Sequence, residues 1–132
     1  MKKIYPSREQ CLFIFCDDIR QEVGNKPSIM GWYSNNDILF HGERMITPLA
    51  IAFAVYDGEG EFNVRFEIEN PKGEVKIKGD LGNNRKFLDK AMVTISKISA
   101  IEFANEGVHK VKFYLDEELY EENLIIKKAL KS

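Results

Sequence analysis

Long apolar segments are missing from this sequence. The run from Leu12 to Cys16 is five residues long before Asp17 and Asp18 interrupt it, whereas a membrane-spanning helix needs about 20 apolar residues. The first ten residues, MKKIYPSREQ, have the positive charge of an export signal but lack its apolar core. We therefore expect neither a membrane span nor an export signal.

Cysteine is scarce, and the two thiols are poorly spaced for a bridge. Cys11 and Cys16 lie five positions apart, which in an extended strand separates them by roughly 16 Å and places them on opposite faces. A disulfide needs Cα atoms within about 7 Å. Two unbridged thiols predict a cytoplasmic protein. Asp17 and Asp18 oppose thiolate formation nearby, so both thiols are expected to be inert.

Motifs of catalysis and of metal binding are also missing. The sequence contains no nucleophile elbow, no glycine-rich phosphate loop and no paired-cysteine zinc spacing. Of the two histidines, His41 is isolated, and His109 is expected to bond a backbone carbonyl rather than act as a ligand. Four carboxylates offer oxygen ligands for calcium: Asp17, Asp18, Glu22 and Asp37. No further ligand spacing in the sequence supports such a site. We expect a non-catalytic protein with no cofactor; an enzyme with a scattered site is the alternative.

Basic charge is not in excess. Lysine and arginine total 19 against 21 acidic residues, a net charge of −2, which excludes a generally basic nucleic-acid binder. A local basic patch remains as a further alternative. Its residues would be Lys76, Lys78, Lys110 and Lys112 with Tyr114. Interleaved glutamates count against it.

Alternation of apolar and polar residues is what the sequence does have. After a break at Asn105-Glu106-Gly107, the residues from His109 to Leu115 alternate, which predicts an antiparallel strand with one buried face. An apolar residue, a glycine and then a ring is how many immunoglobulin-like sandwiches enter their penultimate strand. The segment 80–85 is predicted to be a loop. The segment 87–98 also fits a helical stripe, but its β-branched residues favour a strand over about 91–96.

Turn signals recur about every ten residues, and no long helix is indicated. These features predict a single domain over residues 1–132, an all-β, antiparallel immunoglobulin-like sandwich of about 8–9 strands.

Two of the expected strands are apolar on both faces, at 10–17 and 49–56. A two-layer sandwich covers one face of each sheet, so an apolar second face predicts a partner unless a loop or helix covers it. We expect a protein-binding or assembly module, most simply a homodimer. The predicted interface residues are Phe13, Phe15, Ala50, Ala52, Ala54 and Trp32.

The segment CDDIRQEVGNKPSIMGWY, residues 16–33, resembles the opening of a family of small uncharacterised bacterial proteins. The matching residues are Cys16, Asp17, Asp18, Ile19, Arg20, Glu22, Lys26, Ser28, Gly31 and Tyr33. The resemblance implies a bacterial source and transfers no activity or site. Trp32 departs from the small or aliphatic residue expected there. The polar residues of segment 16–33 are predicted to form a structural clasp between the first two strands: Asp17, Asp18, Arg20 and Glu22. In this clasp the arginine makes a two-pronged pair with a carboxylate.

Overall fold

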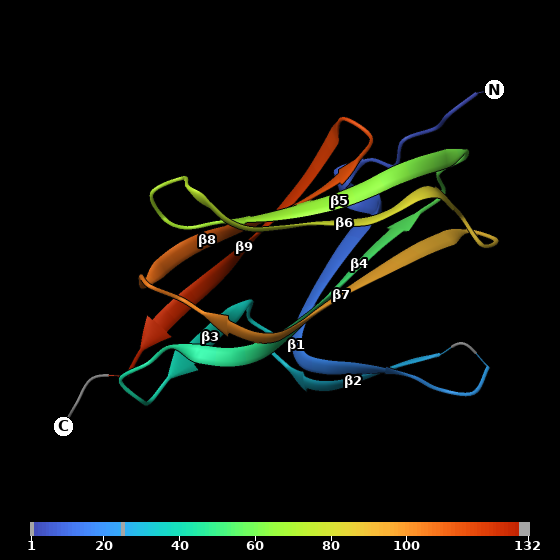
Figure 1. Cartoon of the computed structure of the whole chain (residues 1–132). Coiled ribbons are helices and arrows are strands. Elements are labelled where there is room, and N and C mark those ends of the chain that lie inside the picture. The colour runs from blue at the N-terminus through green and yellow to red at the C-terminus, as the bar shows by residue number, and fades with distance from the viewer. Residues whose placement is uncertain (1, 25, 130–132) are drawn as a thin grey trace.

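Two β-sheets face each other across an apolar core (Figure 1). The computed structural model describes residues 2–24 and 26–129. Within that part of the chain there are nine strands, one short 3-10 turn at Arg8–Gln10 and no α-helix. The all-β sandwich predicted from the sequence is therefore confirmed.

One sheet has four strands and the other has five. The four-stranded sheet runs in the order β2 (Pro27–Trp32), β1 (Cys11–Gln21), β4 (Ile46–Tyr56) and β7 (Ala91–Glu102). The five-stranded sheet runs in the order β3 (Asp37–Phe40), β9 (Glu118–Lys128), β8 (Gly107–Leu115), β5 (Glu61–Glu69) and β6 (Val75–Lys86). Every pairing is antiparallel except that of β3 with β9, which is parallel at the edge of its sheet.

Strand β8 shows why the alternating pattern produces this fold. His109, Val111, Phe113 and Leu115 are buried, while the residues between them face outward. Gly107 opens the strand with φ 120°, a conformation that favours glycine. Because the inward residues meet those of β1 and β4, alternation along each strand becomes a packed core between the layers.

Aromatic rings form the centre of that core. Phe113 stacks on Phe53 of β4 with ring centroids 4.6 Å apart. It also contacts Phe66 of β5 at 5.6 Å and Phe13 of β1 at 5.7 Å. Since β4 and β1 belong to the opposite sheet, this ring ties the two layers together.

The ambiguous segment is a strand, as predicted, and β7 continues beyond it to Glu102. The predicted loop at 80–85 is wrong, because these residues form the second half of β6. Asn84 has φ 55° and Gly82 has φ 127°, and the pairing with β5 shifts register nearby. Bulges of this kind interrupt the period-two pattern from which strands are recognised.

Candidate functional site

The outer face of the four-stranded sheet is apolar. Residues that pair across antiparallel strands point to the same side of the sheet, so the register places Ile14, Ala52 and Ile95 in one row. Leu12, Ala54 and Val93 form the neighbouring row. We call these two rows, together with Ala50, the apolar face.

The apolar face has the relief of a shallow trough. The alanines of β4 form its floor and are almost fully buried between taller neighbours. Leu12 on β1 and Val93 on β7 rise on either side, with 47% and 41% of their surface exposed. Such an apolar surface is typical of a contact site.

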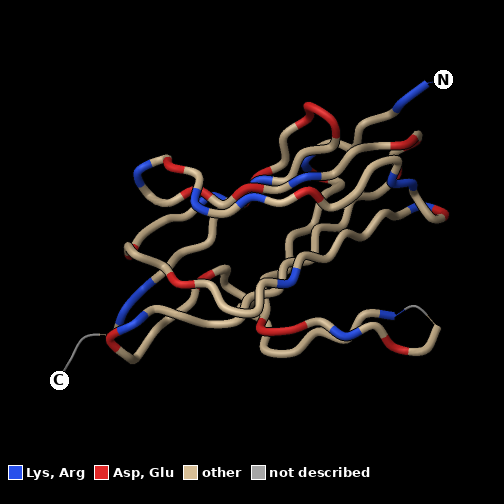
Figure 2. Tube along the Cα trace, in the orientation of Figure 1, with Lys and Arg blue, Asp and Glu red and all other residues tan. Residues whose placement is uncertain are grey.

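The outer face of the five-stranded sheet is charged instead. Figure 2 shows mixed positive and negative residues along that sheet, whereas most of β4 and β7 is uncharged. Lys112 forms an ion pair with Glu69. The Arg65 guanidinium lies 3.7 Å from the centre of the Tyr114 ring, and the Tyr114 hydroxyl donates to Glu67 Oε1 at 3.2 Å. Paired charges of both signs are typical of a solvated surface.

The lysines of the predicted basic patch are among these paired charges. Lys112 is ion-paired with Glu69, and Lys76 Nζ lies 3.8 Å from the Glu74 carboxylate. Lys110 and Lys78 stand across their strands from Glu69 and Glu67. A phosphate backbone would therefore meet lysines interleaved with carboxylates, an arrangement that does not favour its binding.

The predicted interface residues divide between two environments. Phe13 and Phe15 are 6% and 0% exposed and lie in the core between the sheets, so their assignment to an interface is corrected. The three alanines line the apolar face. Trp32 is 61% exposed and stands opposite Cys16, which puts it on the same side of the sheet at the β2 end.

The polar residues predicted to form the clasp have other partners than expected. The Tyr33 hydroxyl donates to Asp17 Oδ1, and burial together with this bond raises the pKa of Tyr33 to about 12. Asp18 accepts from the Ile19 amide at 2.8 Å and lies 3.3 Å from Lys97 Nζ. The amide hydrogen bond, with help from Lys97, lowers the pKa of Asp18.

Arg20 and Glu22 do not take part as predicted. Both are exposed, and no side-chain hydrogen bond or ion pair joins either of them to the described residues. The backbone amide of Glu22 donates to the Lys26 carbonyl at 2.7 Å. The two-pronged arginine pair is therefore corrected to a tyrosine–aspartate bond.

Both cysteines are free thiols, as predicted. Burial raises the pKa of Cys11 to about 12 and that of Cys16 to about 11. Asp17 and Asp18 contribute to the rise at Cys16. Both thiols are therefore in the protonated, less nucleophilic form at neutral pH.

No group of three or more potential metal-ligating side chains occurs within residues 2–24 and 26–129. Of the four candidate calcium ligands, Asp37 lies on β3 and pairs with Lys127 at 3.1 Å. Asp17 and Asp18 are taken up by Tyr33 and Lys97. The four carboxylates thus do not form one site.

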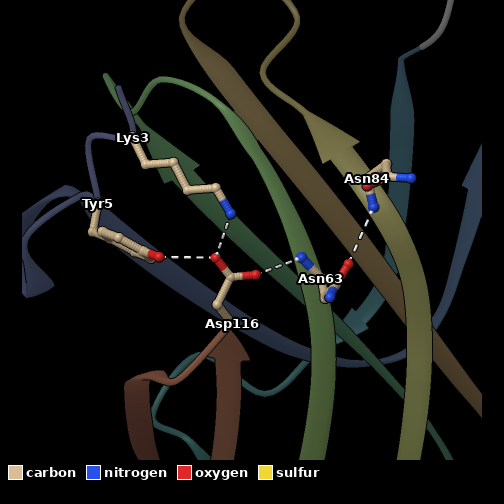
Figure 3. Close-up of polar contacts among 5 residues, drawn as sticks. All are labelled: Lys3, Tyr5, Asn63, Asn84 and Asp116. Atoms are coloured by element: carbon tan, nitrogen blue, oxygen red, sulfur yellow. Dashed lines mark hydrogen bonds and ion pairs between the residues drawn. The ribbon is translucent and has the colours of Figure 1, made fainter. Parts of the chain in front are cut away.

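A polar network around Asp116 was not anticipated from the sequence (Figure 3). Asp116 Oδ2 accepts from Lys3 Nζ at 2.9 Å and from the Tyr5 hydroxyl at 2.8 Å. Its Oδ1 accepts from the Asn63 amide at 2.9 Å, and Asn63 Oδ1 accepts from the Asn84 amide at 3.3 Å. The network ties the N-terminal segment to the five-stranded sheet, so its role is structural. Lys3 and Tyr5 lie more than 100 residues from Asp116 in the sequence, so no local signal pointed to their bonds.

Replacing Asp116 by Ala is expected to lower the free energy of unfolding by about 2 kcal/mol at pH 7, because three hydrogen bonds to a carboxylate are lost. Burial opposes ionisation, but the bonds from Lys3, Asn63 and Tyr5 outweigh it and lower the pKa of Asp116. The stabilisation is therefore present above the ordinary carboxyl pKa and fades as the pH falls through the lowered value. Urea denaturation at pH 7 and at pH 3 measures both effects.

Asp57→Ala is the matched control. Asp57 also sits in a turn with positive φ, 61° against 53° for Asp116, and its carboxylate makes no hydrogen bond to the described residues. Equal losses of stability in the two variants would contradict the network and leave only the backbone effect.

Comparison of the chain with protein-family models finds no match, and comparison with curated protein sequences finds none either. Among the described residues, no helix is long and apolar enough to cross a membrane.

Proposed function

We propose that this protein is a non-catalytic assembly module that binds protein through its apolar face, with a second copy of the same chain as the partner. The observation that carries the proposal is the difference between the two outer faces. One is covered by paired charges, and the other carries Leu12 and Val93 at 47% and 41% exposure around a floor of alanines. Burying such a face removes apolar area from water.

A second copy fits this relief. With a two-fold axis parallel to the strands and placed between β4 and β7, each β7 lies over the β4 of the other copy. Val93 and Ile95 of each chain then enter the alanine floor of its partner. The same surface serves both sides, so no second type of site is needed.

The size of the face sets the strength of the contact. Three strands about 4.8 Å apart and six residues of about 3.3 Å each span roughly 300 Å² in projection. Specific interfaces bury about 800 Å² per partner. Even with Trp32 added at the edge, we expect a dimer that dissociates on dilution.

Changing Val93 to Glu is expected to abolish dimerisation, because it places a charge in the centre of the contact. The molar mass from light scattering, followed from micromolar to near-millimolar concentration, should rise toward two chains for the wild type and stay at one chain for the variant. Leu12→Glu should weaken the dimer less, because β1 lies at the edge of the contact. Both sites are well exposed, so the fold should survive in each variant.

The charged sheet supplies a matched control for each variant. Leu119 on β9 and Val108 on β8 are both 43% exposed, close to the values for Leu12 and Val93. Leu119→Glu and Val108→Glu should leave the dimer intact. A wild-type mass of one chain at all concentrations would refute the homodimer, and equal loss in all four variants would refute the apolar face as its site.

The same proposal includes a bacterial source and a place in the cytoplasm. Support for the first is the likeness of residues 16–33 to small bacterial proteins. Support for the second is the pair of unbridged thiols.

A further inference from the structure

A cavity of about 350 Å³ opens at one end of the sandwich. It lies where the β5–β6 turn and the connection from β7 to β8 come together, at the left of Figure 1. Most of its wall is apolar and comes from Ile68, Ile77, Ile101 and Phe103. A volume of this size lies at the lower end of the range for small-molecule sites, which are mostly apolar with a few polar groups.

The polar group that distinguishes this cavity is His109. The residue is 3% exposed, and its ring meets the edge of Phe103 with centroids 5.0 Å apart. Its Nδ1 lies 3.1 Å from the Gly107 carbonyl oxygen. Because a carbonyl oxygen can only accept, Nδ1 must carry the proton. Burial lowers the pKa of His109, so the ring is neutral near pH 7.

This tautomer leaves Nε2 as a hydrogen-bond acceptor. No hydrogen bond to Nε2 occurs within the described part of the chain. Thr94 Oγ1 is the one side-chain nitrogen or oxygen atom in the described part of the chain that is fully buried and lacks a hydrogen bond. Nε2 therefore keeps some accessible surface, and the cavity that His109 lines is the opening beside its ring.

Of the other polar side chains around the cavity, Asn70 and Glu102 are bonded and Lys76 is ion-paired with Glu74, whereas Asn105 makes no side-chain hydrogen bond within the described part of the chain. Asn70 Oδ1 accepts from the amides of Lys72 and Glu74, and its Nδ2 donates to Glu74. Glu102 forms a two-pronged pair with Arg44. An anionic ligand would find no free donor on the histidine ring. A neutral ligand with a donor would satisfy Nε2.

We propose that this cavity binds a small neutral molecule that has an apolar body and one hydroxyl or N–H group, which donates to His109 Nε2. The site lies away from Leu12 and Val93, so it stands or falls independently of the proposed dimer.

Phenol and toluene are the probes, since they share a ring and differ in the donor. Titrated into ¹⁵N-labelled protein at pH 7, phenol should shift the His109 Nε2 resonance and the amides of the lining residues in a saturable way. Toluene should bind about tenfold more weakly, because it leaves the buried acceptor without a partner. His109→Leu should remove the preference for phenol.

Ala104→Trp tests the site without altering the core. Ala104 lines the cavity and is exposed, so the indole should close the mouth and abolish the phenol shifts. Leu88→Trp adds the same side chain on the β6–β7 connection, where Leu88 is 75% exposed, and should leave binding unchanged. The proposal is overturned if phenol gives no saturable shift, if toluene binds as well as phenol, or if binding survives in Ala104→Trp.

Discussion

Phe113→Ala is expected to lower the free energy of unfolding by about 4 kcal/mol, among the largest effects of any single replacement in this chain. Truncating a buried phenylalanine typically costs about 3–5 kcal/mol, since apolar contacts are lost and a cavity remains. Phe113 is fully buried and contacts three other rings, of which Phe53 and Phe13 belong to the opposite sheet. Urea denaturation followed by circular dichroism measures the loss.

Phe87→Ala provides the comparison. Phe87 is only partly buried and contacts a single ring, Phe62, at 6.0 Å, so its truncation should cost much less. Phe113→Leu, which keeps most of the volume, should fall between the two. If Phe113→Ala destabilised the protein no more than Phe87→Ala, the ring stack would not be the centre of the core.

The arrangement of the core follows from the alternation of apolar and polar residues along each strand. Most of the core was predictable for that reason. In β8, every second residue from His109 to Leu115 is apolar or a ring, and each of these is buried. The turn at Asn70–Gly73 carries a local signal as well, with proline at its second position and glycine at its fourth, and the Gly73 amide donates to the Asn70 carbonyl at 2.9 Å. Both signals are local, so neither needed knowledge of the partner strands.

Alternation does not show which face of a strand is buried where both of its faces are apolar. In β1, nothing local decides whether Phe13 and Phe15 or Leu12 and Ile14 point inward. Volume decides it, because the space between two sheets accepts large rings, and Phe53 and Phe113 already lie there. The aromatic residues therefore became core, and the smaller side chains became the apolar face. The sequence predicted an uncovered face but named two of its residues wrongly.

Contacts between distant residues were the other part that the sequence could not supply. Asp17 reaches Tyr33, and Asp116 reaches Lys3, only after the strands have paired. The open nitrogen of His109 likewise depends on the cavity formed by two separate connections. Residue types alone favoured Arg20 as the partner of a carboxylate, whereas the geometry of the β1–β2 hairpin gave that place to Tyr33.

Gly31 is a position in the β1–β2 hairpin that does not tolerate a larger residue. Its φ is 67°, a conformation that costs an L residue roughly 1–2 kcal/mol. A Cβ there would lie 2.2 Å from Asp17 Oδ2 and 2.7 Å from Asp17 Cγ. The Asp17 side chain would have to move, and its bond with the Tyr33 hydroxyl would be lost.

Gly31→Ala is therefore expected to lower the free energy of unfolding by about 3 kcal/mol, the sum of backbone strain and the displaced aspartate. Gly73→Ala separates the two terms, because Gly73 has φ 82° and nothing within 4 Å of its added Cβ. That variant should lose only about 1 kcal/mol. In an Asp17→Ala background, Gly31→Ala should fall close to the value for Gly73→Ala, since the carboxylate is gone and only the Cβ of residue 17 remains near, at 3.0 Å. Urea denaturation of the four variants completes the cycle. An undiminished loss in the Asp17→Ala background would show that the aspartate does not set the requirement for glycine at this position of β2.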